Sequence, residues 1–188
     1  MRGFYWYTSV GMAICTMYIF SNNLHIIPSK TYRIINLLSL VFHFLFLSNF
    51  IIQVITNNKA KKYLKKIPYF FIPLITYFII KDVKNNSAFS FAFTNFGLVF
   101  FCISYYYQLF KNSPTINLLK EPAFWIITGI FFGMSIIIPL TLIGGYLVNT
   151  IPRNIFLPLT LITLLGYGIM HIFFIKGILC SFQFRQSF

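Results

Sequence analysis

Long stretches without a charged residue constrain the fold of this chain more than any other feature of its sequence. Short segments that hold most of the charges divide these stretches into six apolar blocks. A bilayer core about 30 Å thick requires roughly 20 apolar residues in a helix. The spacing predicts an all-α, polytopic membrane bundle of about six transmembrane helices, over residues 4–22, 32–55, 67–80, 89–110, 122–148 and 154–182. The third block is short, but the lysines at its two ends can reach the headgroups.

The composition excludes a soluble fold. Hydrophobic residues make up 58% of the 188 positions and charged residues only 9%, whereas a soluble domain carries about a quarter of its residues as Asp, Glu, Lys and Arg. The mean hydropathy of +0.78 leads to the same conclusion. Because the segments between the blocks are short, we expect a single transmembrane domain over residues 1–188 and no soluble output domain.

Basic residues predict the orientation of the chain in the membrane. Fifteen Lys and Arg against two acids give a formal net charge of +13. In a soluble chain this surplus would indicate nucleic-acid binding, but here the basic residues lie between apolar blocks, and we expect no nucleic-acid partner. An even number of spans places both termini on one side, together with ten of the fifteen basic residues. Since cytoplasmic segments are the richer in Lys and Arg, both termini are predicted to be cytoplasmic.

The densest basic cluster lies between the second and third blocks, in the predicted loop 57–66 (NNKAKKYLKK). Its five lysines are Lys59, Lys61, Lys62, Lys65 and Lys66. One interpretation is an anchor at the anionic cytoplasmic leaflet, where each lysine contributes about 1 kcal/mol. The other is a docking site for an acidic protein partner.

Polar residues recur at helical spacing in the second, fourth and sixth blocks, so each of these blocks has one mildly polar face. The simpler interpretation is helix–helix packing, because small and hydroxylated residues are common where membrane helices meet. The functional interpretation is an internal cavity for a small ligand or a lipid tail. Its interior face would consist of Asn36, Ser39, His43, Thr94, Thr163, Tyr167 and His171.

The sequence offers few residues for catalysis or metal binding. His43 and His171 would differ in depth by about 11 Å at a rise of 1.5 Å per residue, which is too far for two ligands of one metal ion. The two acids, Asp82 and Glu121, lie at block edges, whereas proton-coupled transporters use carboxylates within the membrane. We therefore predict no catalytic residue, no metal site and no cofactor.

A GxxxG motif, Gly129 and Gly133, lies within the fifth block. In membranes such pairs allow two helix backbones to approach closely. We predict that this pair packs against another helix, either of the same chain or of another molecule.

Two segments carry a family resemblance. One is the proline–x–Phe-Trp–glycine start of the fifth block, residues 121–129 (EPAFWIITG), and the other is the end of the fourth block, residues 105–110 (YYYQLF), with the short loop of Lys, Asn, Ser and Pro that follows it. Both resemble a family of small bacterial inner-membrane proteins with six or seven spans. Its members, mostly uncharacterised, accompany histidine-kinase signalling systems or resemble their sensor regions. The resemblance implies a sensor or accessory role in a bacterial inner membrane, and the longer members of the family carry an extra N-terminal span.

These observations together predict a non-enzymatic membrane sensor or accessory protein. It would bind a hydrophobic ligand or partner helices between the second, fourth and sixth helices and signal through a separate membrane or cytoplasmic protein. Two alternatives stay open. A small transporter or channel would require a continuous water-accessible path, and a structural subunit of a larger membrane complex would hold neither a ligand nor a pore.

Overall fold

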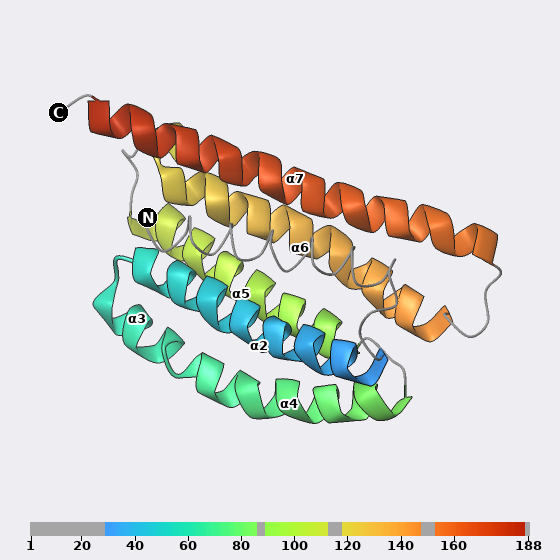
Figure 1. Ribbon diagram of the computed structural model, residues 1–188. Coiled ribbons are helices and arrows are strands. Elements are labelled where there is room, and N and C mark those ends of the chain that lie inside the picture. The colour runs from blue at the N-terminus through green and yellow to red at the C-terminus, as the bar shows by residue number, and fades with distance from the viewer. Residues whose placement is uncertain (1–28, 86–88, 113–117, 148–152, 187–188) are drawn as a thin grey trace. The chain divides into compact units, whose positions relative to one another are not determined.

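The computed structural model describes residues 29–85, 89–112, 118–147 and 153–186, and the elements formed by these residues are all helical (Figure 1). In chain order they are α2 (Ser29–Val54), α3 (Asn58–Leu64), α4 (Ile67–Asn85), α5 (Phe89–Asn112), the 3-10 helix η1 (Leu118–Lys120), α6 (Pro122–Leu147) and α7 (Arg153–Gln186). The predicted all-α class is confirmed for this part of the chain. The first predicted span, residues 4–22, lies outside the described residues.

Four of the described helical segments are long and apolar enough to cross a membrane. They are Asn58–Lys81, Phe89–Lys111, Pro122–Ile143 and Leu161–Phe182. A shorter apolar helical stretch, Ser39–Val54, belongs to α2. The four segments overlap the third to sixth predicted blocks, so the chain has the helices of a membrane protein, while the total of six spans stays a prediction.

The chain divides into two compact units, Met1–Ser39 and Leu40–Phe188. Within the second unit α5 and α6 are the most buried of the four candidate spans, with 50% and 44% of their apolar windows covered by other residues, compared with 17% for the segment containing α4 and 22% for α7. The core of this unit therefore lies around α5 and α6, and α4 and α7 flank it with largely exposed apolar faces.

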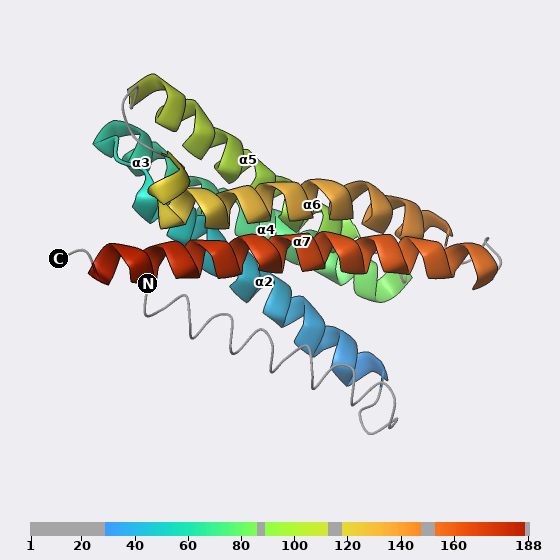
Figure 2. The ribbon, with the colours of Figure 1, turned by 90° about the horizontal axis from the view of Figure 1, so that it is seen from above.

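The helices α6 and α7 form an antiparallel pair and run side by side in both ribbon views (Figures 1 and 2). Their backbones approach closely at glycines. A Cβ atom placed on Gly129 would lie 2.7 Å from the Cβ of Phe173, and one placed on Gly133 would lie 2.9 Å from the Cβ of Met170. On the opposite helix, a Cβ on Gly177 would lie 2.9 Å from the carbonyl oxygen of Pro122. The GxxxG motif thus lies in a contact with the next helix of the same chain.

A cluster of phenylalanines joins α2, α4 and α5. The ring centroid of Phe44 on α2 lies 5.6 Å from that of Phe71 on α4 and 6.1 Å from that of Phe101 on α5. Phe71 also stacks on Phe93, at 5.2 Å. These rings occupy the space beside Gly97, where a Cβ would lie 2.8 Å from Phe71 and 2.9 Å from Phe44. Aromatic side chains therefore fill the region where these three helices meet.

Candidate functional site

Thr94 is fully buried on α5. Its hydroxyl donates to the carbonyl oxygen of Ser90, one turn back, at 2.7 Å. Such a bond satisfies a hydroxyl within its own helix. The burial of Thr94 therefore requires no ligand.

Other hydroxyl groups on the described helices follow the same pattern, since each donates to a carbonyl oxygen three or four residues back. They belong to Ser48, Thr76, Ser104, Thr128, Thr141, Thr163 and Ser181. Thr94 and Ser104 of α5 and Thr163 of α7 thus make hydrogen bonds within single helices. This arrangement agrees with the simpler interpretation of the stripes as packing surfaces.

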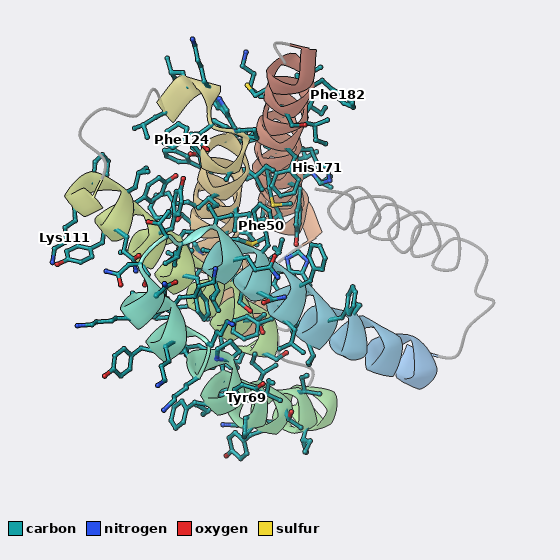
Figure 3. All side chains as sticks on the ribbon, turned by 90° about the vertical axis from the view of Figure 1, so that its left-hand side faces the viewer. Phe50, Tyr69, Lys111, Phe124, His171 and Phe182 are labelled. Carbon is teal, nitrogen blue, oxygen red and sulfur yellow. The ribbon has the colours of Figure 1, made fainter. Side chains whose placement is uncertain are left out.

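His171 has an exposed side chain on α7, and Figure 3 labels its position on that helix. Its Nδ1 lies 2.7 Å from the carbonyl oxygen of Tyr167. Because a carbonyl oxygen only accepts, Nδ1 carries the proton in this bond, and in the neutral form of the ring Nε2 is an acceptor. Tyr167 itself is half-buried. His171 therefore presents a hydrogen-bond acceptor on the surface of an apolar helix.

The remaining predicted interior residues belong to α2. The backbone of Asn36 is helical, and its side chain lies outside the described residues. Ser39 and His43 are half-buried and lie four residues apart, so they share one face of the helix. The predicted residues occupy different environments, from the core at Thr94 to the surface at His171. A single cavity lined by all seven stays a prediction.

One hydrogen bond between side chains links α5 to α6, and sequence reasoning missed it. The hydroxyl of Tyr106 donates to Oγ1 of Thr128 at 2.7 Å, and Thr128 donates in turn to the carbonyl oxygen of Phe124 at 2.6 Å. The two bonds form a short relay that ends on the backbone of α6, and bonds in such a chain strengthen one another. The run of tyrosines at 105–107 is visible in the sequence. The partner of Tyr106 is not, because it depends on where α5 crosses α6.

A second set of contacts ties η1 to the start of α6 and to α7. The carbonyl oxygen of Leu119 accepts a hydrogen bond from Nε1 of Trp125 at 2.9 Å and a weaker one from Sγ of Cys180 at 3.8 Å. The Nζ of Lys176 lies 5.8 Å from the centroid of the Trp125 ring, which is cation–π distance. Together these contacts hold the indole of Trp125 in one orientation at this end of the helix pair.

Most of the lysine-rich segment is helical, as α3, whereas the sequence predicted a loop over residues 57–66. Asn57 caps α3, because its side-chain oxygen accepts from the backbone N–H of Lys59 at 3.0 Å and of Ala60 at 3.3 Å. Leu64 is buried and anchors the helix. Lys61 donates from Nζ to the carbonyl oxygen of Gln53, at 2.9 Å, near the end of α2.

The other four lysines of this segment point into solvent. They are Lys59, Lys62, Lys65 and Lys66. Figure 3 shows two further outward residues, Tyr69 on α4 and Lys111 at the end of α5. The segment thus offers four free ammonium groups to a lipid surface or to an acidic partner, and Lys61 has a structural role.

Two buried polar atoms of α5 have no hydrogen-bond partner among the residues that the structure describes, Nδ2 of Asn95 and Oε1 of Gln108. Asn95 is only 1% exposed. It lies eleven residues before Tyr106, which is three helical turns, so both residues belong to the same face of α5. An unpaired amide donor in a low-dielectric interior is unfavourable by about 1–3 kcal/mol. The position is therefore the least satisfied polar group of the described core.

Among the described residues, no group of three or more His, Cys, Asp or Glu side chains could hold a metal ion. Comparison of the chain with protein-family models, with curated proteins and with solved structures found no match.

Proposed function

We propose that the protein is a non-enzymatic membrane sensor or accessory protein. It binds a partner helix or a hydrophobic ligand within the bilayer through the outer face of α7, and it signals through a separate membrane or cytoplasmic protein. The observation that carries this proposal is the contrast between the two sides of α7. One side packs on α6 at glycines, whereas the other exposes apolar side chains together with the polar ring of His171.

The outer face of α7 has properties that suit a protein partner better than lipid alone. Its exposed apolar residues include Leu161, Leu164, Leu165, Ile172, Ile175 and Leu179. Among them lies Gly168, where an added Cβ would meet no described atom within 4 Å. A small residue allows a second helix to approach closely, and an acceptor such as Nε2 of His171 is unfavourable in hydrocarbon without a donor. A partner helix with a hydroxyl or amide donor meets both conditions, because it packs closely at Gly168 and donates to Nε2 of His171.

The interior supports lateral binding over transport or catalysis. Phenylalanine rings fill the junction of α2, α4 and α5, and the buried hydroxyls donate to carbonyls of their own helices. A channel requires a continuous polar path, which such an interior does not favour. An enzyme requires positioned acid, base or nucleophilic groups, and the two acids of the chain lie at block edges.

The proposal includes the location and topology inferred from the sequence. The protein crosses a bacterial inner membrane six times and has both termini in the cytoplasm. This location agrees with the resemblance of the 121–129 segment to sensor-associated proteins. In this orientation the four free lysines of the segment 57–66 face the anionic cytoplasmic leaflet, where they bind lipid or an acidic partner. The four candidate spans and the outward lysines support this arrangement.

The test compares two substitutions on α7. The protein is purified in mild detergent from its native membrane after cross-linking, and the associated proteins and lipids are identified. We expect His171→Phe to reduce recovery of the partner about tenfold, the factor for about 1.4 kcal/mol and within the range for one hydrogen bond in a membrane. Ile162→Phe, also on an exposed apolar position of α7, should leave recovery unchanged.

Two results would contradict this function. Equal recovery of the partner with the two variants would show that His171 does not contribute to binding. Labelling of a Thr94→Cys variant by aqueous thiol reagents from both sides of the membrane would show a water path through the core and favour the transporter.

A further inference from the structure

A row of three aromatic rings, Trp125, Phe132 and Phe173, lies along the contact between α6 and α7 and leads to a lysine. The centroid of Phe173 lies 5.9 Å from that of Trp125 and 6.3 Å from that of Phe132. At the Trp125 end the ammonium of Lys176 lies over the indole, and at the other end Phe132 is about half exposed. This aromatic row therefore joins a cation to an apolar surface on one side of the helix pair.

Lys176 has an unusual position for a charged residue. It lies inside the apolar segment Leu161–Phe182, six residues before the end of that segment, which is about 9 Å along the helix axis. Its side chain is exposed, and among the described residues it contacts the indole of Trp125 and forms no ion pair. A lysine at this depth extends its stem toward the headgroups. Its ammonium is therefore available to an anion at the membrane interface.

Trp125 fixes the depth and direction of this cation. Its Nε1 donates to the carbonyl oxygen of Leu119, so the indole has a single orientation with one ring face toward Lys176. Tryptophan at a helix end marks the headgroup level of the bilayer. Phe132 lies seven residues further along α6, about 10 Å toward the membrane centre. The ammonium of Lys176 at the interface thus matches the headgroup of a lipid, and the aromatic rings below it match the acyl chain of the same lipid.

We propose that the aromatic row and Lys176 bind an anionic phospholipid. The phosphate pairs with the ammonium of Lys176, and one acyl chain lies along Phe173 and Phe132. An anionic lipid suits this surface because the protein is strongly cationic, with fifteen basic residues against two acids. Lys176 lies apart from His171, since the two residues are five positions apart and point about 140° apart around the helix.

The test uses Trp125 as the reporter. The chain has two tryptophans, so the full-length Trp6→Phe variant leaves Trp125 as the single source of indole fluorescence. This variant is reconstituted in phosphatidylcholine vesicles that contain either brominated phosphatidylglycerol or brominated phosphatidylcholine at the same mole fraction. Bromine on the acyl chain quenches an indole in contact with it. We expect phosphatidylglycerol to occupy the site about fivefold more strongly than phosphatidylcholine.

Three further variants in the same background separate the site from general attraction to a basic protein. Lys176→Gln should abolish the preference for phosphatidylglycerol, and Lys176→Arg should retain it. Lys62→Gln removes the same charge from an exposed position on α3 and should also retain it. The helical circular dichroism signal in unbrominated phosphatidylcholine, unchanged among the variants, verifies that each one is folded.

Three results would overturn the proposal. The first is equal quenching by the two brominated lipids in the parent protein, and the second is a preference that survives Lys176→Gln. The third is displacement of the brominated lipid by millimolar glycerol phosphate, which would show a site for soluble phosphates. Insensitivity to glycerol phosphate supports a phospholipid.

Discussion

Replacement of Gly129 by alanine tests how the α6–α7 pair is held together. The added methyl group would lie 2.7 Å from the Cβ of Phe173 and 3.0 Å from the carbonyl oxygen of Met170. Neither atom can rotate away, because one is attached directly to the backbone of α7 and the other belongs to it. The two helices must therefore separate or shift to accommodate the methyl group.

The expected magnitude follows from a comparison with Gly168→Ala on the outer face of α7. Overpacking lowers the free energy of unfolding by about 1–3 kcal/mol, while alanine gains about 1 kcal/mol over glycine in a helix. Gly168→Ala has the propensity gain alone, since no described atom lies within 4 Å of the new methyl group. The propensity terms cancel between the two variants. Gly129→Ala should thus be less stable than Gly168→Ala by about 1–3 kcal/mol, a factor of about 5 to 150 in the unfolding equilibrium.

Equilibrium unfolding in mixed micelles, with increasing sodium dodecyl sulfate and circular dichroism as the signal, measures this difference. Gly97→Ala serves as an intermediate case. Its methyl group would meet ring atoms of Phe44 and Phe71, and these rings can tilt, so its loss of stability should be smaller than that of Gly129→Ala. Equal stability of the Gly129 and Gly168 variants would refute the close backbone contact on which this reasoning rests.

Two further predictions concern polar groups of α5, measured by the same unfolding assay. Tyr106→Phe removes the donor to Thr128 and should lower the free energy of unfolding by about 0.5–1.5 kcal/mol, as for other hydrogen bonds between membrane helices; no change would mean that the bond contributes nothing. Asn95→Leu replaces the buried, unpaired amide by an apolar group of similar volume and should raise the free energy of unfolding by about 1–2 kcal/mol. A loss of stability in this second variant would instead show that the amide has a partner, such as a bound water molecule or a ligand.

Helix positions could be predicted from the sequence because charges mark the ends of apolar blocks. The fourth and fifth blocks, predicted at 89–110 and 122–148, correspond to α5 and α6 at Phe89–Asn112 and Pro122–Leu147. The segment 57–66 was predicted as a loop and is largely helical, because the Asn57 cap and the single buried Leu64 determine its structure. One buried leucine among five lysines is too weak a periodic signal to reveal a helix.

The contacts between helices could not be predicted, since they depend on which helices are neighbours. Periodicity placed Thr94 and Thr163 on polar faces, but a threonine in a helix always has a carbonyl one turn back within reach, and both hydroxyls use it. The bond from Tyr106 to Thr128 and the ring contact between Trp125 and Phe173 can be predicted only when the crossing points of the helices are known. Asn95 gave no signal either, because its burial depends on what covers that face of α5.

The glycine contacts also limit how the α6–α7 pair can move. Atoms of the opposite helix lie within 3.0 Å of the place that a Cβ would take at Gly129, Gly133 and Gly177, so a side chain at any of these three positions requires the two helices to shift. The contact between α5 and α6 is of another kind, because it includes the Tyr106 hydroxyl and aromatic rings that can rotate. A displacement of α5 against α6 can therefore be absorbed by side chains, whereas a displacement of α6 against α7 is opposed by backbone atoms.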